Sequence, residues 1–339
     1  MDNPTASQMS PPRPAVKAAT RYAPIALLLV VLYAGVPLAL GDNRYVMSII
    51  VAALTIGGVA LAWALLGNLG GMVSFGHAAF FGVGSYASAL LVMKLDVPVL
   101  AAVPLGGVGA ALAALLMIPA LRLRGPYFAL AILAYAHIFR IIATEWTSLT
   151  NGAGGLSSIP RFPEVAGFDL GGKVGAYCII LTMLVAFVAV YRKVRASHYG
   201  LALRAMQESE AATRVVGVNS TFLKSLMLLL SAFMAGAMGA FNAHYINFLE
   251  PDYAFSSLWT TIPIVAAIFG GYRTISGPLV GAVVVYLVDQ LVFKNLISSG
   301  HQLILGALLG AMVIFSPEGL WPPLVHTFRR IRRPAHAEA

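Results

Sequence analysis

Runs of apolar residues long enough to cross a lipid bilayer as helices recur along most of this chain. Roughly 17 to 25 such residues suffice for one crossing. The chain is 59% hydrophobic and only 10% charged, which excludes a soluble globular domain. The pattern predicts an all-α polytopic membrane protein with about ten transmembrane helices. We expect these at about 22–40, 46–66, 75–93, 98–120, 126–144, 174–191, 225–245, 258–272, 277–293 and 303–320. The glycine-rich third run and the short eighth run could instead form re-entrant or broken helices.

The positions of the basic residues predict which way the helices run. Lys and Arg collect on the cytoplasmic side of membrane proteins. With both termini cytoplasmic, sixteen of the 22 Lys and Arg residues fall in inside segments, five fall outside and Arg140 lies within a span. The predicted organisation is a cytoplasmic tail over 1–21, a membrane domain over 22–322 with an external loop at 145–173, and a basic cytoplasmic tail over 323–339. This topology accounts for the net charge of +9 better than nucleic-acid binding does.

The longest strongly polar and basic run between apolar segments covers residues 192–224. Apolar residues alternate with charges in it, which favours one or two short amphipathic helices ending at Gly217. Its basic character places it in the cytoplasm. Two interpretations stay open: a solvated loop, or a surface that docks a cytoplasmic partner.

A second informative stretch, residues 67–85, is rich in glycine, alanine and serine. Small residues let helices approach closely, and glycine also lets a helix break where it lines a cavity. His77 lies in the middle of this stretch and must face protein or water rather than lipid. We expect it to form a structural hydrogen bond or to line a pathway. The candidates for a translocation pathway here are Phe75, Gly76, His77, Phe80 and Phe81.

Several polar residues lie near the predicted outer ends of spans. His137 and Arg140 are three residues apart and share one helix face. Arg140 could pair with Glu145 or with Asp289, or extend to the interface. Asn242 polarises the outer end of the seventh span and could form part of an external mouth. His137, Arg140 and Asn242 complete the set of pathway candidates.

The sequence offers no arrangement that supports catalysis. Gly167, Gly172 and Lys173 have the spacing of a phosphate-binding loop, but Val174 replaces the Ser or Thr that would bind magnesium. The single cysteine, Cys178, has no partner for a disulfide or a metal site. We therefore expect a non-catalytic chain without a cofactor of its own. A secondary transporter or channel driven by ions is the alternative from another class, and it would need intramembrane carboxylates for coupling.

Several motifs in order resemble those of LivM-type permeases from high-affinity branched-chain amino acid importers. The most specific is S-F-G-H-A-A-F-F-G-V-G-S-Y at 74–86. Glu210-Ala211-Ala212 followed by Gly217 is similar to the EAA loop of ATP-driven importer permeases, with four residues before the glycine instead of the common three. The further matches are L-R-L-R-G-P-Y-F-A-L at 121–130, T-N-G-A-G-G-L at 150–156, G-G-Y-R-T-I-S-G-P-L-V-G-A at 270–282 and F-S-P-E-G-L-W at 315–321.

The resemblance implies a permease subunit in the bacterial inner membrane that imports leucine, isoleucine and valine. It implies four kinds of partner: a LivH-like second permease, LivG-like and LivF-like ATPases that hold ATP and magnesium, and a periplasmic binding protein. Relatives that carry urea, amides or other amino acids are an open alternative. The residues implied for ATPase coupling are Arg204, Glu208, Glu210, Ala211, Ala212 and Gly217. Those expected at close packing or turns are Gly82, Gly270, Gly271, Gly277, Pro278 and Gly281.

Overall fold

A computed structural model describes residues 26–123, 125–294 and 306–307 of the chain. Two predicted tails, 1–21 and 323–339, lie outside these residues, as do the motif at 315–321 and nearly all of the predicted last span at 303–320. The first predicted span lies partly outside them.

The described part of the chain is built mainly of apolar helices. Six segments are long and apolar enough to cross a membrane: α3 (Arg44–Gly70), α4 (His77–Leu95), α6 (Pro126–Glu145), α8 (Lys173–Ala196), α11 (Ser220–Ile246) and Pro251–Gly270, which joins α12 (Pro251–Ala254) to α13 (Leu258–Gly270). Three helical segments are apolar but shorter. The first, Ala26–Leu40, ends in η1 (Val31–Gly35) and α2 (Val36–Leu40), and the second is α5 (Val99–Leu115). The third, Gly277–Val292, comprises α14 (Gly277–Val288) and most of the π-helical turn η4 (Asp289–Phe293). The all-α membrane prediction is thus confirmed, whereas the count of ten spans and the orientation of the termini stay predictions.

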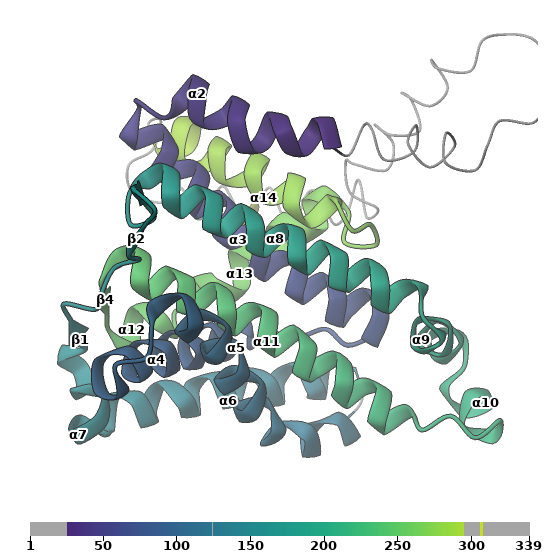
Figure 1. The fold of residues 1–339 in the computed structure, drawn as a ribbon. Helices are drawn as coiled ribbons and strands as arrows, with labels where there is room; N and C mark the ends of the chain where they lie inside the picture. The colour runs from purple at the N-terminus through teal and green to yellow at the C-terminus, as the bar shows by residue number, and fades with distance from the viewer. Residues whose placement is uncertain (1–25, 124, 295–305, 308–339) are drawn as a thin grey trace, which may run out of the picture.

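The short elements gather at the two ends of the helix bundle (Figure 1). At one end lie α9 (His198–Glu208) and α10 (Glu210–Val215). The strands lie at the opposite end, where β1 (Leu156–Ser157) pairs antiparallel with β4 (Phe248–Leu249), and β2 (Glu164–Val165) with β3 (Phe168–Asp169). The remaining short helices are η2 (Ile118–Arg122), α7 (Thr147–Thr150) and η3 (Gly152–Gly154). The predicted external loop at 145–173 is therefore ordered, and it contains the short helix α7.

Glycines bring the central helices into backbone contact. Helix α11 packs against α3, α4 and α5. A Cβ atom added at Gly84 on α4 would overlap the backbone of Gly236 on α11, and one added at Gly239 would overlap the carbonyl oxygen of Phe81. A Cβ at Gly106 on α5 would lie 2.6 Å from the oxygen of Gly84. The spacing of small residues thus sets how closely α4, α5 and α11 approach.

The hairpin of α13 and α14 is held in the same way. A Cβ at Gly270 would overlap the carbonyl of Gly277, and one at Gly281 the carbonyl of Ala266. Gly271 ends α13 with a positive φ of 93°, and Pro278 occupies the first turn of α14. Gly82 packs elsewhere, against the ring of Phe255. The residues expected at close packing and turns all lie at such places.

A partly buried segment between α3 and α4 is not helical. Helix α3 ends at Gly70, Gly71 adopts a positive φ of 66°, and α4 begins only at His77. Met72, Ser74 and Gly76 between them are buried. The glycine-rich third span is thus an unbroken helix that follows a non-helical entry, residues 71–76.

We predict that Gly84→Ala destabilises the protein while Gly67→Ala does not. Both glycines lie inside helices, but a Cβ at Gly67 meets nothing closer than 3.9 Å. Overpacking lowers the stability by about 1–3 kcal/mol. Replacing a helical glycine with alanine where there is space raises the stability by roughly 0.5–1 kcal/mol. The measurement is the melting temperature of each purified variant in mild detergent. Equal melting temperatures for the two variants would contradict the close packing described above.

Candidate functional site

The coupling segment, residues 192–224, folds into short helices because a polar side chain caps each of its helix starts. Ser197 Oγ accepts from the backbone N–H of Gly200 at 3.3 Å, which starts α9. Ser209 Oγ accepts from Ala212 N–H at 3.2 Å and starts α10, and Asn219 Oδ1 accepts from Phe222 N–H at 3.0 Å and starts α11. Gly217 follows α10 with a positive φ of 87°, a conformation that glycine adopts without strain. The prediction of one or two short helices ending at Gly217 is confirmed.

The coupling segment has a buried side and an apolar exposed side. Leu203 and Met206 of α9 are buried. Ala211, Ala212 and Gly217 are exposed, and residues Val215 and Val216 are 88% and 78% exposed. Two neighbouring valines with this exposure, together with Leu201 at 68%, present apolar surface that a partner could cover.

Ion pairs fix α10 to the start of α11. The Glu210 carboxylate accepts from Arg214 at 2.7 Å and from Lys224 at 2.8 Å. The hydrogen bond from Lys224 is the main cause that lowers the pKa of Glu210, and Ser220 and Arg214 lower it further against the opposing effect of burial. Glu210 therefore stays ionised at neutral pH.

The other two charged residues expected at the coupling site are placed differently. The Arg204 guanidinium donates to the carbonyl of Arg195 at 2.8 Å and to that of Gly200 at 3.3 Å, which ties α9 to the end of α8. Glu208 is exposed and forms no hydrogen bond or ion pair with the described residues. Only Glu210 of the two acids contributes to the internal structure of the segment.

Gln207 connects the coupling segment to the membrane helices. Its Nε2 donates to the carbonyl of Asn68 and, at 3.2 Å, to that of Leu69, at the end of α3. The Asn68 side chain donates in turn to Tyr191 Oη of α8 at 2.9 Å and to the Arg273 carbonyl at 3.0 Å. Sequence reasoning missed this cluster, because single amide side chains in polar stretches give no pattern.

Buried hydrogen bonds hold the non-helical entry to α4. His77 is fully buried, with Nδ1 3.1 Å from Ser74 Oγ and Nε2 2.9 Å from Ser231 Oγ on α11. Ser231 donates to the Ala62 carbonyl of α3 at 2.8 Å, and Trp63 Nε1 donates to the Ser74 carbonyl at 2.9 Å. We call these five residues the His77 cluster. Of the two roles predicted for His77, this geometry favours the structural hydrogen bond.

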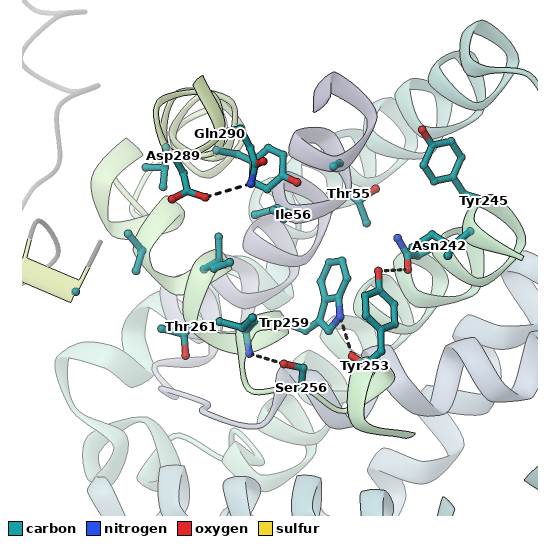
Figure 2. A pocket seen from close by; sticks show the side chains of 18 residues that line it. Thr55, Ile56, Asn242, Tyr245, Tyr253, Ser256, Trp259, Thr261, Asp289 and Gln290 are labelled. Carbon is teal, nitrogen blue, oxygen red and sulfur yellow. Dashed lines mark hydrogen bonds between the residues drawn. The ribbon is translucent and has the colours of Figure 1, made fainter. Parts of the chain in front are cut away.

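A cavity of about 440 Å³ is lined by residues near the C-terminal end of α11, which leads into β4 (Figure 2). Its walls come from α3, α11, α12, α13, α14 and η4. Ile56, Trp259, Val265 and Val285 make one part of the lining apolar. The polar groups at its edge include Thr55, Asn242, Tyr253, Tyr286 and Asp289.

The polar residues of the cavity lie in two separate places. Asn242 on α11 is 5% exposed, and its Oδ1 accepts from Tyr253 Oη at 2.9 Å. Asp289 at the end of α14 is 4% exposed, and Gln290 Nε2 lies 3.3 Å from its Oδ2. Figure 2 shows Asp289 and Gln290 on one side and Asn242, Tyr253 and Trp259 on the other.

The remaining pathway candidates do not line this cavity. Gly76, Phe80 and Phe81 are buried between helices, and the Phe81 ring stacks on that of Trp259 at 3.9 Å between centroids. Phe75 is 43% exposed outside the cavity. Of the pathway candidates, the structure places only Asn242 at its wall.

Arg140 does not pair with Asp289. Its Nη1 lies 2.7 Å from Asp252 Oδ1 in α12; the side chains of Arg140 and Asp252 are 45% and 79% exposed, and His137 is exposed too. The suggested pairs of Arg140 with Asp289 or Glu145 were therefore wrong, because α12 brings an acid to the end of α6 that the sequence order did not reveal.

We predict that Glu210→Gln loosens α10. The substitution removes the ionic part of two contacts, each worth roughly 0.2–1 kcal/mol. Trypsin should then cleave the purified protein after Arg214 about two to five times faster at neutral pH. The partners lower the pKa of Glu210 in the folded protein. The ion pairs therefore stabilise α10 fully at pH values above the ordinary pKa of glutamate, and this stabilisation is lost as the pH falls through the lowered pKa. Glu208→Gln is the matched control and should leave the cleavage rate unchanged; an equal increase for both variants would contradict the assignment.

Comparison with known proteins gives the family. The family model for the permease component of branched-chain amino acid transport systems matches residues 45–317. The LivM permease proteins of the high-affinity branched-chain amino acid transport systems of Salmonella typhimurium and Escherichia coli are 27% and 26% identical over 249 residues. This stretch is 66% of the chain and 58% of each relative, so the chain spans less than two thirds of their length.

The LivH permease protein of Escherichia coli is also similar, at 24% identity over 250 residues, which cover 69% of this chain and 80% of that protein. No solved structure matches the chain. The match to the family model covers most of the sequence and agrees with the apolar helices of the structure. The chain therefore belongs to the family of permease components of branched-chain amino acid transport systems and is a multi-pass membrane protein.

Proposed function

We propose that this protein is a permease subunit of an ATP-driven importer in the bacterial inner membrane, carrying leucine, isoleucine and valine. The proposal rests on one observation: this family member carries an exposed apolar surface and a cavity at separate places in the bundle. An exposed apolar surface lies on the coupling segment at one end of the bundle, and a partly polar cavity is lined by residues near the C-terminal end of α11.

The coupling segment is the proposed contact with ATPase subunits. Val215 and Val216 expose apolar surface next to Ala211 and Ala212, while Glu210 holds α10 in place. ATP and magnesium belong to the partners in this proposal. An ATPase moves the permease only if its ATP-bound form binds one conformation of the permease more tightly than the other. The hydrogen bonds of Gln207 to α3 offer a route from the docked surface to the membrane helices.

The proposed assembly contains two permeases. Because the chain is similar to both LivM and LivH of Escherichia coli, we expect a LivH-like subunit to supply the other half of the pathway. The proposed ATPases are LivG-like and LivF-like proteins. A periplasmic binding protein would deliver the substrate at the end that carries the strands.

The cavity supports an aliphatic substrate. Ile56, Val265 and Val285 present branched apolar side chains to it, and Trp259 adds a large apolar ring. Its volume of about 440 Å³ falls in the range of roughly 300–1,000 Å³ that small-molecule sites occupy. The relatives' names refer to branched-chain amino acids.

We predict that Val215→Asp combined with Val216→Asp abolishes ATPase docking. Two carboxylates at the proposed interface would remain unpaired and costly to bury. The tagged variant should purify as a folded chain with at least about tenfold less ATPase, which corresponds to about 1.4 kcal/mol of lost binding. Leucine-stimulated ATP hydrolysis should fall with it.

The control is Val165→Asp, which changes a valine that is 47% exposed at the opposite end of the bundle. It should retain the ATPases, because they dock at the coupling segment at the other end. Normal ATPase recovery with the double variant would refute the docking surface. A wild-type chain that purifies without any ATPase would refute the proposed function as a whole.

A further inference from the structure

We propose that Asp289 binds the ammonium group of the transported amino acid inside the cavity. This inference rests on the proposed function and extends it, because it assigns a substrate site and the charge that the substrate must carry. It follows from an unsatisfied carboxylate, from the local helix geometry and from the groups on the opposite wall.

Among the described residues, the Asp289 carboxylate lacks a full set of partners. It is only 4% exposed, and no donor among the described residues reaches its Oδ1. Its Oδ2 receives a single long contact from the Gln290 amide at 3.3 Å. A buried ionised group without a partner is costly, and more so within a membrane domain. A cationic ligand in the cavity would remove this cost.

The charged groups near Asp289 leave this role open. The Lys294 ammonium lies 3.5 Å from Gln290 Oε1 rather than at the carboxylate. Arg140, which the sequence suggested as a partner of Asp289, pairs with Asp252 instead. The phenol of Tyr286, one turn before Asp289, lines the same cavity.

Asp289 begins a π-helical turn. Residues Asp289–Phe293 continue α14 with the wider spacing of a π-helix. Such turns interrupt the regular backbone hydrogen bonding and occur frequently at functional sites. Asp289 and Gln290 both line the cavity from this turn.

The opposite wall offers a group for the carboxylate of the substrate. Tyr253 Oη donates to Asn242 Oδ1 at 2.9 Å, which directs the amide oxygen away from ligands. The Asn242 Nδ2 group forms no hydrogen bond with the described residues, so both of its hydrogens remain to be donated. Ile56 lies between Asp289 and Asn242 (Figure 2), and Val265 and Val285 also line the cavity, which gives an apolar surface for an aliphatic side chain.

The arrangement therefore selects a zwitterion with an apolar side chain. Urea, amides and simple carboxylates lack the cationic amine and would leave the Asp289 carboxylate unpaired. The site thus favours amino acids over the other substrates that the sequence left open.

The first test measures leucine uptake by the complete transporter in liposomes, driven by ATP and the loaded binding protein. Asp289→Asn keeps the shape and removes the charge. We expect uptake to fall at least about tenfold, while assembly and basal ATP hydrolysis stay within about twofold of wild type. The matched control is Asp42→Asn, an acid-to-amide change at an exposed position, which should leave uptake unchanged. Normal uptake by Asp289→Asn would overturn the proposal.

A second test needs no functional variant and bypasses the binding protein. Saturation-transfer NMR on the wild-type transporter in nanodiscs compares leucine, 3-methylbutylamine, which lacks the carboxylate, and 4-methylpentanoate, which lacks the amine. We expect the two amines to bind and the acid to bind at least about tenfold more weakly. Binding of 4-methylpentanoate as strong as that of leucine would overturn the proposal even where Asp289→Asn fails to assemble. Absence of leucine uptake by the wild type would count against the proposed function alone, because the ligand comparison still decides the site.

Discussion

The His77 cluster is the contact on which the arrangement of the bundle depends. A membrane domain must satisfy backbone polar groups internally, and a non-helical segment is tolerated only where protein or a water-filled cavity surrounds it. In the non-helical residues 71–76, Met72, Ser74 and Gly76 are buried against protein, and Trp63, His77 and Ser231 supply hydrogen bonds to this segment and its neighbours. Because these residues come from α3, α4 and α11, the same bonds fix three central helices to one another. The glycine contacts of α4, α5 and α11 then set the distances between them.

The cluster also lies between the two features assigned to function. Gln207 of the coupling segment bonds to the last carbonyls of α3, directly before residues 71–76. These residues lead to His77 and then to Phe81, whose ring stacks on Trp259 at the cavity wall. A continuous series of contacts thus joins the proposed ATPase surface to the proposed substrate site. Contact alone does not show coupling, since coupling requires two conformations that both sites bias.

The sequence predicted the features that rest on local patterns. Apolar runs predicted the helices, the charged stretch predicted α9 and α10, and glycines such as Gly270 and Gly281 predicted close packing. Features that depend on distant residues were missed. The partner of Arg140 was wrong, because Asp252 approaches it only through the fold. The cavity could not be found, because its walls come from α3, α11, α13 and α14, and Asp289 has no neighbour in sequence that reveals its burial. Phe80 and Phe81 are buried in the core, and their role along a pathway stays a prediction.

The most direct test of the account asks whether nucleotide at the coupling end changes the cavity. In a variant with Cys178→Ala and Thr261→Cys, the new thiol lies at an exposed edge of the cavity and is the single cysteine of the chain. The measurement is the rate at which a polar maleimide labels this thiol in the complete transporter, with and without ATP bound to the ATPases. We predict at least about a threefold change in rate, because one conformation closes the cavity that the other opens. An unchanged rate in a transporter that still hydrolyses ATP and imports leucine would contradict the account.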